Sequence, residues 1–326
     1  MSLKTSGRIG SYKVLAILVV GSMLIAGCTS TKPVKWPSRD ELIPKTAVKM
    51  TPASDKSPPV LHLSGWQSPV PMPSPISSAG GEDSPYMTPD GKTFYFFFTP
   101  DVSIPAEKQL GQGATGIYYS TKTGDAWSMP QRIKLEKDPT TALDGCPTVY
   151  QETLWFCSVR NGGYREIDLY TAHIGDGKFT SVKNAGKRIN KEVQVGEMTF
   201  TPDGNEIYFH NNKLGGKGKE DIFVTKKVND VWQDPVAVDA VNTADTDGWP
   251  FITQDGKELW FTRWYQGTPG IFRSIKNGTG WGVPELIVSS FAGEPNLDSA
   301  GNLYFVHHYY NNGTMIEADI YVCYKK

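Results

Sequence analysis

The sequence lacks several features that would mark common classes of protein. Its 33 basic and 34 acidic residues give a net charge of −1, so there is no excess of positive charge for binding nucleic acid through its phosphates. No Cys/His spacing typical of zinc, no Ser-His-Asp set in a supporting context and no nucleotide fingerprint occurs. A glycine-rich loop at 214–219 has no helix after it that would hold a phosphate. The sequence therefore predicts no metal site and no nucleic-acid partner.

The N-terminus has the pattern of an export signal. Lys4, Arg8 and Lys13 precede the apolar run 14–27, which is short for a membrane span. The end of this run, Leu24-Ile25-Ala26-Gly27-Cys28, resembles the lipobox of bacterial lipoproteins. We expect a signal peptide over 1–27 and lipidation at Cys28, the alternative being an uncleaved membrane anchor. Thr29 in place of Asp favours the outer membrane of a bacterial envelope by analogy with lipoprotein sorting, with the periplasmic or surface side left open.

A phrase of roughly 50 residues is repeated five times along the rest of the chain. In each copy a strand-like run leads into a turn, of which three are Asp-Gly, and returns as an aromatic strand. Before the turn, one position holds Pro85, Pro147, Met198, Pro250 or Pro295. After the turn stand Tyr95-Phe96, Trp155-Phe156, Tyr208-Phe209, Trp260-Phe261 and Tyr304-Phe305.

Each copy continues with a third strand, and four of the five also have a fourth. The third strands are 116–120, 168–172, 221–225, 270–274 and 319–323, and the fourth often reads Trp-x-x-Pro. The last copy ends at Lys326 without its own fourth strand, but the missing phrase occurs early, as Trp66-Gln67-Ser68-Pro69. We therefore predict an all-β fold over 61–326, a five-bladed β-propeller whose last blade receives its outer strand from the N-terminal segment.

Residues 28–60 are rich in Pro, Ser and Lys, and we interpret them as a lipidated flexible tether. Cys146 and Cys157 flank the turn of the second repeat and can face each other across a hairpin. A disulfide between them and a pair of buried free thiols both remain open.

The phrases 88–96 (TPDGKTFYF) and 201–209 (TPDGNEIYF) resemble the Pro-Asp-Gly type of WD-like propeller repeat. This repeat is found in TolB-like and other exported bacterial proteins. The resemblance covers about residues 64–326 and implies the fold. It does not imply an activity, because the repeat family includes binding modules, peptidase gating domains and lyases.

Every repeat places a carboxylate near its proline position. These residues are Glu82, Asp83, Asp144, Glu197, Asp247 and Glu294. We expect them to form an acidic ring around the central channel, on one face of the propeller. One interpretation is structural, with the acids bonded to backbone amides. The other is functional, with the ring binding a sugar or a cation, or catalysing a reaction.

The architecture also resembles five-bladed arabinanases, β-xylosidases and fructosidases, which use three axial carboxylates. That resemblance implies Asp83, Asp144 and Glu197 as catalytic residues if the protein is an enzyme. The motifs that surround the catalytic residues in those families are missing here.

Positions that vary between repeats are the better candidates for ligand binding. Arg263 with Trp264, and His307, break the pattern near the end of the second strand with side chains suited to sugars or anions. Together with Asp247 and Glu294, they complete the predicted ligand-binding set.

The sequence favours a monomeric lipid-anchored envelope protein whose propeller binds a protein partner or an oligosaccharide. The alternative is a glycoside hydrolase. No cofactor is expected, apart from a possible cation in the channel.

Overall fold

The computed structural model describes residues 37–137, 141–190 and 196–326, which belong to one unit of the chain. Its regular structure is nearly all antiparallel β-sheet. The helical elements of these ranges are single turns: α1 (Arg39–Leu42), α2 (Lys187–Asn190), and the 3-10 turns η1 (Ala106–Lys108) and η2 (Leu110–Gln112). None of the helices described is long and apolar enough to cross a membrane.

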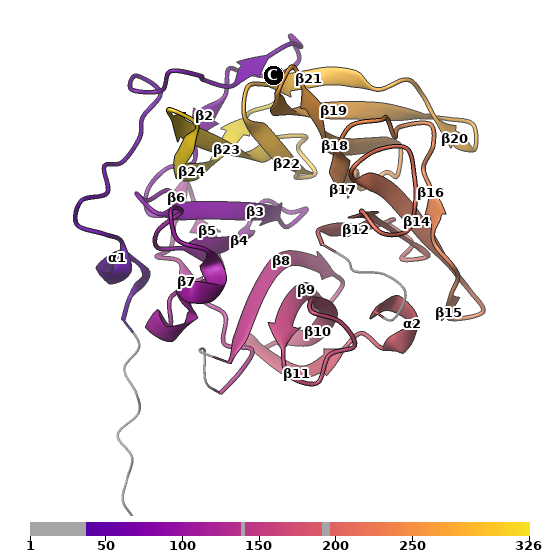
Figure 1. The fold of residues 1–326 in the computed structure, drawn as a ribbon, viewed down its shortest axis with the longest axis horizontal. Coiled ribbons are helices and arrows are strands. Elements are labelled where there is room, and N and C mark those ends of the chain that lie inside the picture. The colour runs from indigo at the N-terminus through magenta and orange to yellow at the C-terminus, as the bar shows by residue number, and fades with distance from the viewer. Residues whose placement is uncertain (1–36, 138–140, 191–195) are drawn as a thin grey trace, which may run out of the picture. The chain divides into compact units, whose positions relative to one another are not determined.

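Each sequence repeat forms one antiparallel sheet, and the sheets are arranged around a common axis (Figure 1). We call these sheets blades 1 to 5. The innermost strands are β3 (Gly81–Met87), β8 (Ala142–Tyr150), β12 (Met198–Phe200), β17 (Asp247–Ile252) and β22 (Ala292–Leu297). The second strands are β4 (Thr93–Thr99), β9 (Thr153–Arg160), β13 (Glu206–Asn211), β18 (Glu258–Tyr265) and β23 (Leu303–Asn311).

The third strands are β5 (Gly116–Thr123), β10 (Asp168–Gly175), β14 (Asp221–Val228), β19 (Thr268–Asn277) and β24 (Thr314–Cys323). Outside the third strands lie β6 (Ala126–Trp127), β7 (Gln131–Arg132), β11 (Lys178–Asn184), β15 (Val231–Trp232), β16 (Val236–Ala237), β20 (Gly280–Trp281) and β21 (Glu285–Ser289), of which all but β11 and β21 have two residues. Each innermost strand contacts the next around the axis, including β22 with β3, so the ring is closed. The all-β propeller is confirmed, and the arrangement is consistent with five blades.

The N-terminal segment contributes a strand to each of the last two blades, and the displaced Trp-x-x-Pro phrase predicts the one in the last blade. Strand β2 (Val70–Pro71) pairs with β24, and Trp66 forms a bridge with Lys325. Strand β1 (Val60–Leu61) pairs with β21 of blade 4. The closure of the last blade by an N-terminal strand is therefore confirmed.

The hydrophobic core lies between neighbouring blades. The second aromatic of each repeat is nearly or fully buried: Phe96, Phe156, Phe209, Phe261 and Phe305. Burying a phenylalanine contributes about 1.5–3 kcal/mol, so the repeated aromatic pair is a main source of the ring's stability. Each core cluster combines side chains of adjacent blades, as in the contact of Tyr95 with Phe179.

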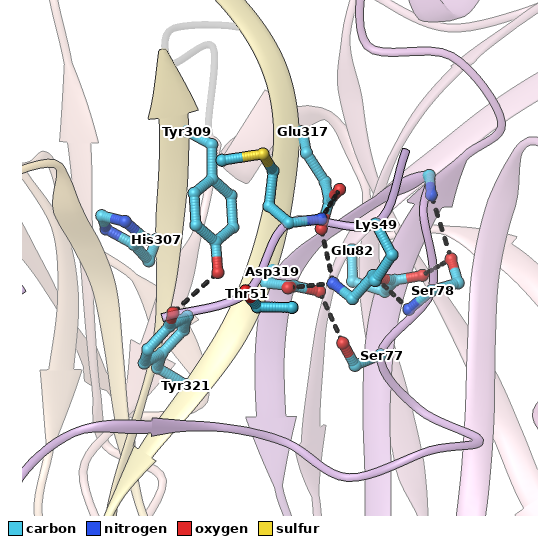
Figure 2. A network of polar contacts seen from close by, with 12 residues as sticks. Lys49, Thr51, Ser77, Ser78, Glu82, His307, Tyr309, Glu317, Asp319 and Tyr321 are labelled. Atoms are coloured by element: carbon cyan, nitrogen blue, oxygen red, sulfur yellow. Dashed lines mark hydrogen bonds and ion pairs between the residues drawn. The ribbon is translucent and has the colours of Figure 1, made fainter. Parts of the chain in front are cut away.

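Residues 39–55, which we call the strap, contact the propeller (Figure 2). The guanidinium of Arg39 is buried and donates to the carbonyls of Pro75 and Ile76, at 2.7 and 2.8 Å. Lys49 forms ion pairs with Glu317 and Asp319, and the Met50 N–H donates to Glu317 at 2.7 Å. The predicted tether therefore does not extend to residue 60, because the strap supplies partners for buried polar groups of blades 1 and 5.

The antiparallel strand order gives the propeller two different faces. On one, the innermost strands begin, and with them the predicted carboxylates; we call this the acidic face. On the other lie the hairpins between innermost and second strands, such as the Asp90-Gly91 turn; we call this the turn face.

Candidate ligand site at the propeller axis

A β-bulge at the start of the innermost strands aims side chains into the axial channel. The residue before the proline position has a left-handed backbone in Ser84, Cys146, Trp249 and Glu294, with φ of 48°, 53°, 50° and 57°. At each of them the pairing with the second strand shifts register. Non-glycine residues rarely adopt this conformation, and such residues cluster at functional sites. These four residues and Glu197, at the same position of blade 3, line the axial cavity.

Three carboxylates converge around one serine at this bulge. The Ser84 N–H donates to Asp83 Oδ1 at 2.8 Å and to Glu294 Oε2 at 2.9 Å. The Ser84 hydroxyl donates to Glu197 Oε1 at 3.2 Å. Asp83 stands where the other repeats have glycine: Gly145, Gly196, Gly248 and Gly293. The axial site therefore consists of Asp83, Glu197 and Glu294, drawn from blades 1, 3 and 5.

Two of the axial carboxylates, Glu197 and Glu294, have raised pKa values. Burial, reinforced by the charge of Asp83, raises the pKa of Glu197 to about 7. Burial also raises the pKa of Glu294 well above its usual value, and the charges of Asp83 and Glu197 add to this shift. Within the described ranges no lysine or arginine forms an ion pair with any of the three. The cluster therefore holds protons near neutral pH and has spare capacity to accept hydrogen bonds.

His210 lies beside this cluster in a defined tautomer. Its Nδ1 accepts the Trp249 N–H at 3.2 Å, so its ring proton is on Nε2. Nε2 lies 3.3 Å from Glu220 Oε2 and 3.8 Å from Glu197 Oε2. Burial lowers the pKa of His210 to about 4, so the ring is neutral at pH 7, with its Nε2 proton on the side of the two carboxylates. The Trp249 indole packs against it, with ring centroids 4.7 Å apart.

The axial cavity is narrow. Its volume is about 40 Å³, which is room for about three water molecules. In the described ranges no group of three or more His, Cys, Asp or Glu residues is arranged to hold a metal ion. A small polar group of a ligand fits among the carboxylates, whereas a whole sugar ring does not.

The other three predicted carboxylates form ion pairs with arginines. Glu82, Asp144 and Asp247, two residues before the bulged position, are buried. Their partners are Arg39 at 3.4 Å, Arg160 at 2.5 Å and Arg263 at 2.6 Å. Asp144 also accepts the Ser158 hydroxyl at 2.6 Å. Asp144 therefore belongs to a buried ion pair rather than to the axial site with Asp83 and Glu197, and Asp247 and Arg263 bind each other.

His307 and Trp264 are also placed apart from the axial site. His307 is fully buried, and its Nε2 lies 2.9 Å from Asp55 of the strap. It therefore faces the strap network of Figure 2 and is not accessible to a ligand. Burial lowers the pKa of its neighbour His308, and the charge of Asp83 partly opposes this shift. Trp264 is 43% exposed at the hairpin between β18 and β19.

The structure joins Cys146 and Cys157 in a disulfide, with Cα atoms 5.4 Å apart, and Cys323 is buried and free. Cys28 and the predicted signal peptide lie outside the described residues.

Sequence reasoning missed Ser84, His210 and Trp249. For Ser84 and Trp249, the available signal was the position just before the proline position, where serine, cysteine, glutamate and tryptophan replace one another while four of the five repeats keep the proline. Because the residue type at this position varies between repeats, its side chain is a better candidate for ligand binding than the positions that repeat. His210 lies elsewhere, in the second strand of blade 3.

No protein-family profile matches this chain, and no curated protein sequence matches it. Many solved structures share its fold. A thermostable family-43 glycoside hydrolase is 16% identical with a TM-score of 0.51, over 76% of this chain and 91% of the hydrolase. TolB from Acinetobacter baumannii is 14% identical with a TM-score of 0.46, over 76% of this chain but 55% of TolB.

An α-L-arabinofuranosidase from Podospora anserina is 11% identical with a TM-score of 0.46, over 80% of this chain and 96% of the enzyme. At these identities, a structural similarity is evidence for a shared fold and not for a shared activity or ligand. Of these three, the family-43 glycoside hydrolase has a TM-score above 0.5, and its similarity supports the all-β propeller fold of this chain.

Proposed function

We propose that this protein is a lipid-anchored protein of the bacterial cell envelope whose propeller binds a glycan at the acidic face. The observation that carries the proposal is the convergence of Asp83, Glu197 and Glu294 around Ser84, without a cationic partner among the described residues. Carboxylate oxygens accept hydrogen bonds from sugar hydroxyls, and the Trp249 indole beside them offers an apolar surface for a sugar face.

The size of the axial cavity supports binding over hydrolysis. A cavity of about 40 Å³ admits a hydroxyl or hydroxymethyl group, so a glycan would rest over the mouth of the channel with one such group inserted. A glycosidase needs its two carboxyl groups on either side of the scissile bond.

Glycan binding is tested with the full chain in detergent micelles by isothermal titration against neutral oligosaccharides from arabinan, xylan, fructan and galactan. We expect Glu197→Gln to weaken binding about ten-fold, since removing one charge-assisted hydrogen bond costs about 1.5–3 kcal/mol. Asp125→Asn removes the same charge from an exposed hairpin of blade 1 and should leave affinity unchanged. Equal binding by both variants would refute the proposal.

A second candidate function, glycoside hydrolysis, is favoured by one observation. A carboxyl group with a pKa of about 7, such as that of Glu197, suits a general acid. Glu294 accepts the backbone N–H of the same serine whose hydroxyl binds Glu197, and glycosidases likewise use a pair of neighbouring carboxyl groups. Release of reducing ends from any of these polysaccharides that is abolished in Glu197→Gln would favour the enzyme. Release that persists in Glu197→Gln would show that Glu197 is not the catalytic acid.

The lipid anchor is tested independently. We expect Cys28→Ser to abolish incorporation of radiolabelled palmitate and to move the protein out of the membrane fraction, because acyl chains supply the membrane affinity. Labelling that persists in Cys28→Ser would refute the predicted lipidation site.

A further inference from the structure

The turn face holds a second cavity, separate from the axial carboxylates. It has a volume of about 480 Å³, which is in the range of small-molecule binding sites. The innermost strands and turns of blades 1 to 4 line it, including Tyr86, Thr88, Tyr150, Phe200 and Gln254.

A short hairpin in blade 2 forms one side of this cavity. In blade 1 four residues separate Thr88 from Thr93, and the Thr88 N–H donates to the Thr93 carbonyl at 2.9 Å. The same closure recurs at Thr201 and Thr253 of blades 3 and 4. In blade 2, Tyr150 pairs directly with Thr153, so this hairpin is two residues shorter. Each strand residue spans about 3.3 Å, so the rim of the ring is lower here.

Aromatic side chains form a fixed wall next to the short hairpin. Tyr150 stacks on Phe200, with ring centroids 5.0 Å apart and planes inclined by 23°. Phe200 also contacts Trp155, at 4.9 Å. The Tyr150 hydroxyl reaches the turn of blade 3, where a Cβ on Gly204 would lie 2.3 Å from it. Contacts on both sides hold the Tyr150 ring in place, which reduces the entropy lost on binding a ligand.

The chemistry of the lining selects a neutral ligand. Threonine hydroxyls and the amides of Gln151 and Gln254 supply the polar groups, and Asp90 is the one carboxylate among the described lining residues. No lysine or arginine is among them, so nothing favours a phosphorylated or acidic ligand. Aromatic faces next to amide and hydroxyl groups match the apolar faces and hydroxyl edges of a sugar. We propose that this cavity binds a neutral saccharide of one or two rings.

This site is distinct from the axial carboxylates and does not depend on their proposed function. The two cavities share Tyr86, Thr148, Thr199 and Phe251 along the channel. The axial end has a volume of only about 40 Å³, too little for a sugar ring to pass. A saccharide on the turn face therefore remains on that side of the propeller.

The test is saturation-transfer NMR on the full chain in detergent micelles, with cellotriose, xylotriose, maltotriose and galactotriose as probes and trigalacturonic acid as the charged comparison. We expect transfer to at least one neutral trisaccharide and none to the trianion. Tyr150→Ala should weaken binding about ten-fold by removing the stacking surface, and Tyr150→Phe should retain it.

Gln254→Trp fills the cavity from an exposed turn without removing any aromatic contact. Glu197→Gln weakens saccharide binding at the acidic face and should retain the transfer that comes from the turn face. Adding Gln254→Trp to Glu197→Gln should abolish this remaining transfer. Three results would overturn the proposal: no transfer from any neutral probe, transfer that persists when Gln254→Trp is added to Glu197→Gln, or transfer lost in Glu197→Gln alone, which would assign the saccharide to the acidic face.

Discussion

Glu197 is 24% exposed and lies near two other carboxylates, an arrangement that carries an energetic cost. Taking a carboxylate partly out of water next to like charges disfavours the charged form. The cluster is therefore expected to destabilise the fold whenever its members ionise, and binding sites often retain this kind of cost.

Replacing Glu197 should show this cost as a dependence of stability on pH. The pKa of Glu197 is raised from 4.5 to about 7, so the folded state binds more protons than the unfolded state between these values. Stability therefore falls as pH rises through this window. We predict that Glu197→Gln is more stable than the unmodified protein at pH 8, by about 1–3 kcal/mol, and that the two converge near pH 4.

Urea unfolding at pH 4 and pH 8 measures this difference, with Asp125→Asn as the exposed control. A Glu197→Gln protein that is less stable at pH 8 would show that the carboxylate is structural.

Asp144 should behave in the opposite way, although the sequence pattern groups it with Glu197. Asp144→Asn leaves the Arg160 guanidinium without its charged partner, and breaking a buried ion pair costs about 3–5 kcal/mol. We predict a loss of stability of this order in urea unfolding, with unchanged glycan affinity in the folded protein. Asp176→Asn, in an exposed turn of the same blade, should change neither. Weakened affinity together with unchanged stability would place Asp144 in the ligand site.

The contrast between Asp144 and Glu197 shows where the sequence stops predicting the site. Both carboxylates precede the proline position, Asp144 by three residues and Glu197 by one. The residue before the proline position lines the axial cavity, whereas the Asp144 side chain, two residues earlier in its strand, pairs with Arg160. A spacing within one strand does not specify a bulge, so the sequence predicted an acidic ring but not its division into two sets.

At the scale of elements, the strap differs most from the prediction. Its Pro-, Ser- and Lys-rich composition is typical of a linker, yet Lys49 and Asp55 contact buried residues of blade 5. Asp144 and Asp247 find arginine partners within their own blades, whereas Asp319 and His307 have partners on the strap. Without the strap, His307 would lose Asp55, and Asp319 would lose its cationic partner and keep the hydrogen bond from the Ser77 hydroxyl.

We predict that Lys49→Ala destabilises the protein by about 1–3 kcal/mol, because Glu317 and Asp319 lose their cationic partner. Lys45→Ala removes an equal charge from an exposed strap position and serves as the control. Thermal unfolding of the two variants gives the comparison, and equal melting temperatures would show that the strap contacts contribute nothing to stability.

At the scale of the whole molecule, the sequence predicted the ring and its closure correctly. The phrase around Trp66 is separated from the last repeat by most of the chain, yet its likeness to the Trp-x-x-Pro strands identified it as the missing outer strand. A repeat constrains the fold strongly because each copy must pair in the same way. The repeat did not predict the short hairpin of blade 2, because the sequence of that hairpin departs from the repeat.

Trp66 joins the two ends of the chain, and its removal should therefore weaken the entire ring. It is 4% exposed, its indole N–H donates to the Gly301 carbonyl at 2.8 Å, and it contacts Trp260 edge-on at 5.7 Å. We predict that Trp66→Ala lowers the free energy of unfolding by about 3–5 kcal/mol in a single transition. Trp264→Ala, at an exposed site, should change it little. A separate early transition of blade 5 alone in Trp66→Ala would show that the blades unfold independently.

Because β2 pairs with β24, the N-terminal strand of the last blade cannot pair until the C-terminal end of the propeller has been synthesised. A ribosome makes Val70 about 250 residues before its partner Val322, an interval on the order of tens of seconds at usual elongation rates. Throughout it, blade 1 has no neighbour on its open side, and exposed strand edges readily mispair with other chains. The yield of folded protein should therefore depend on how quickly translation reaches the last ten residues, and slower elongation should increase aggregation even though the finished ring is stable.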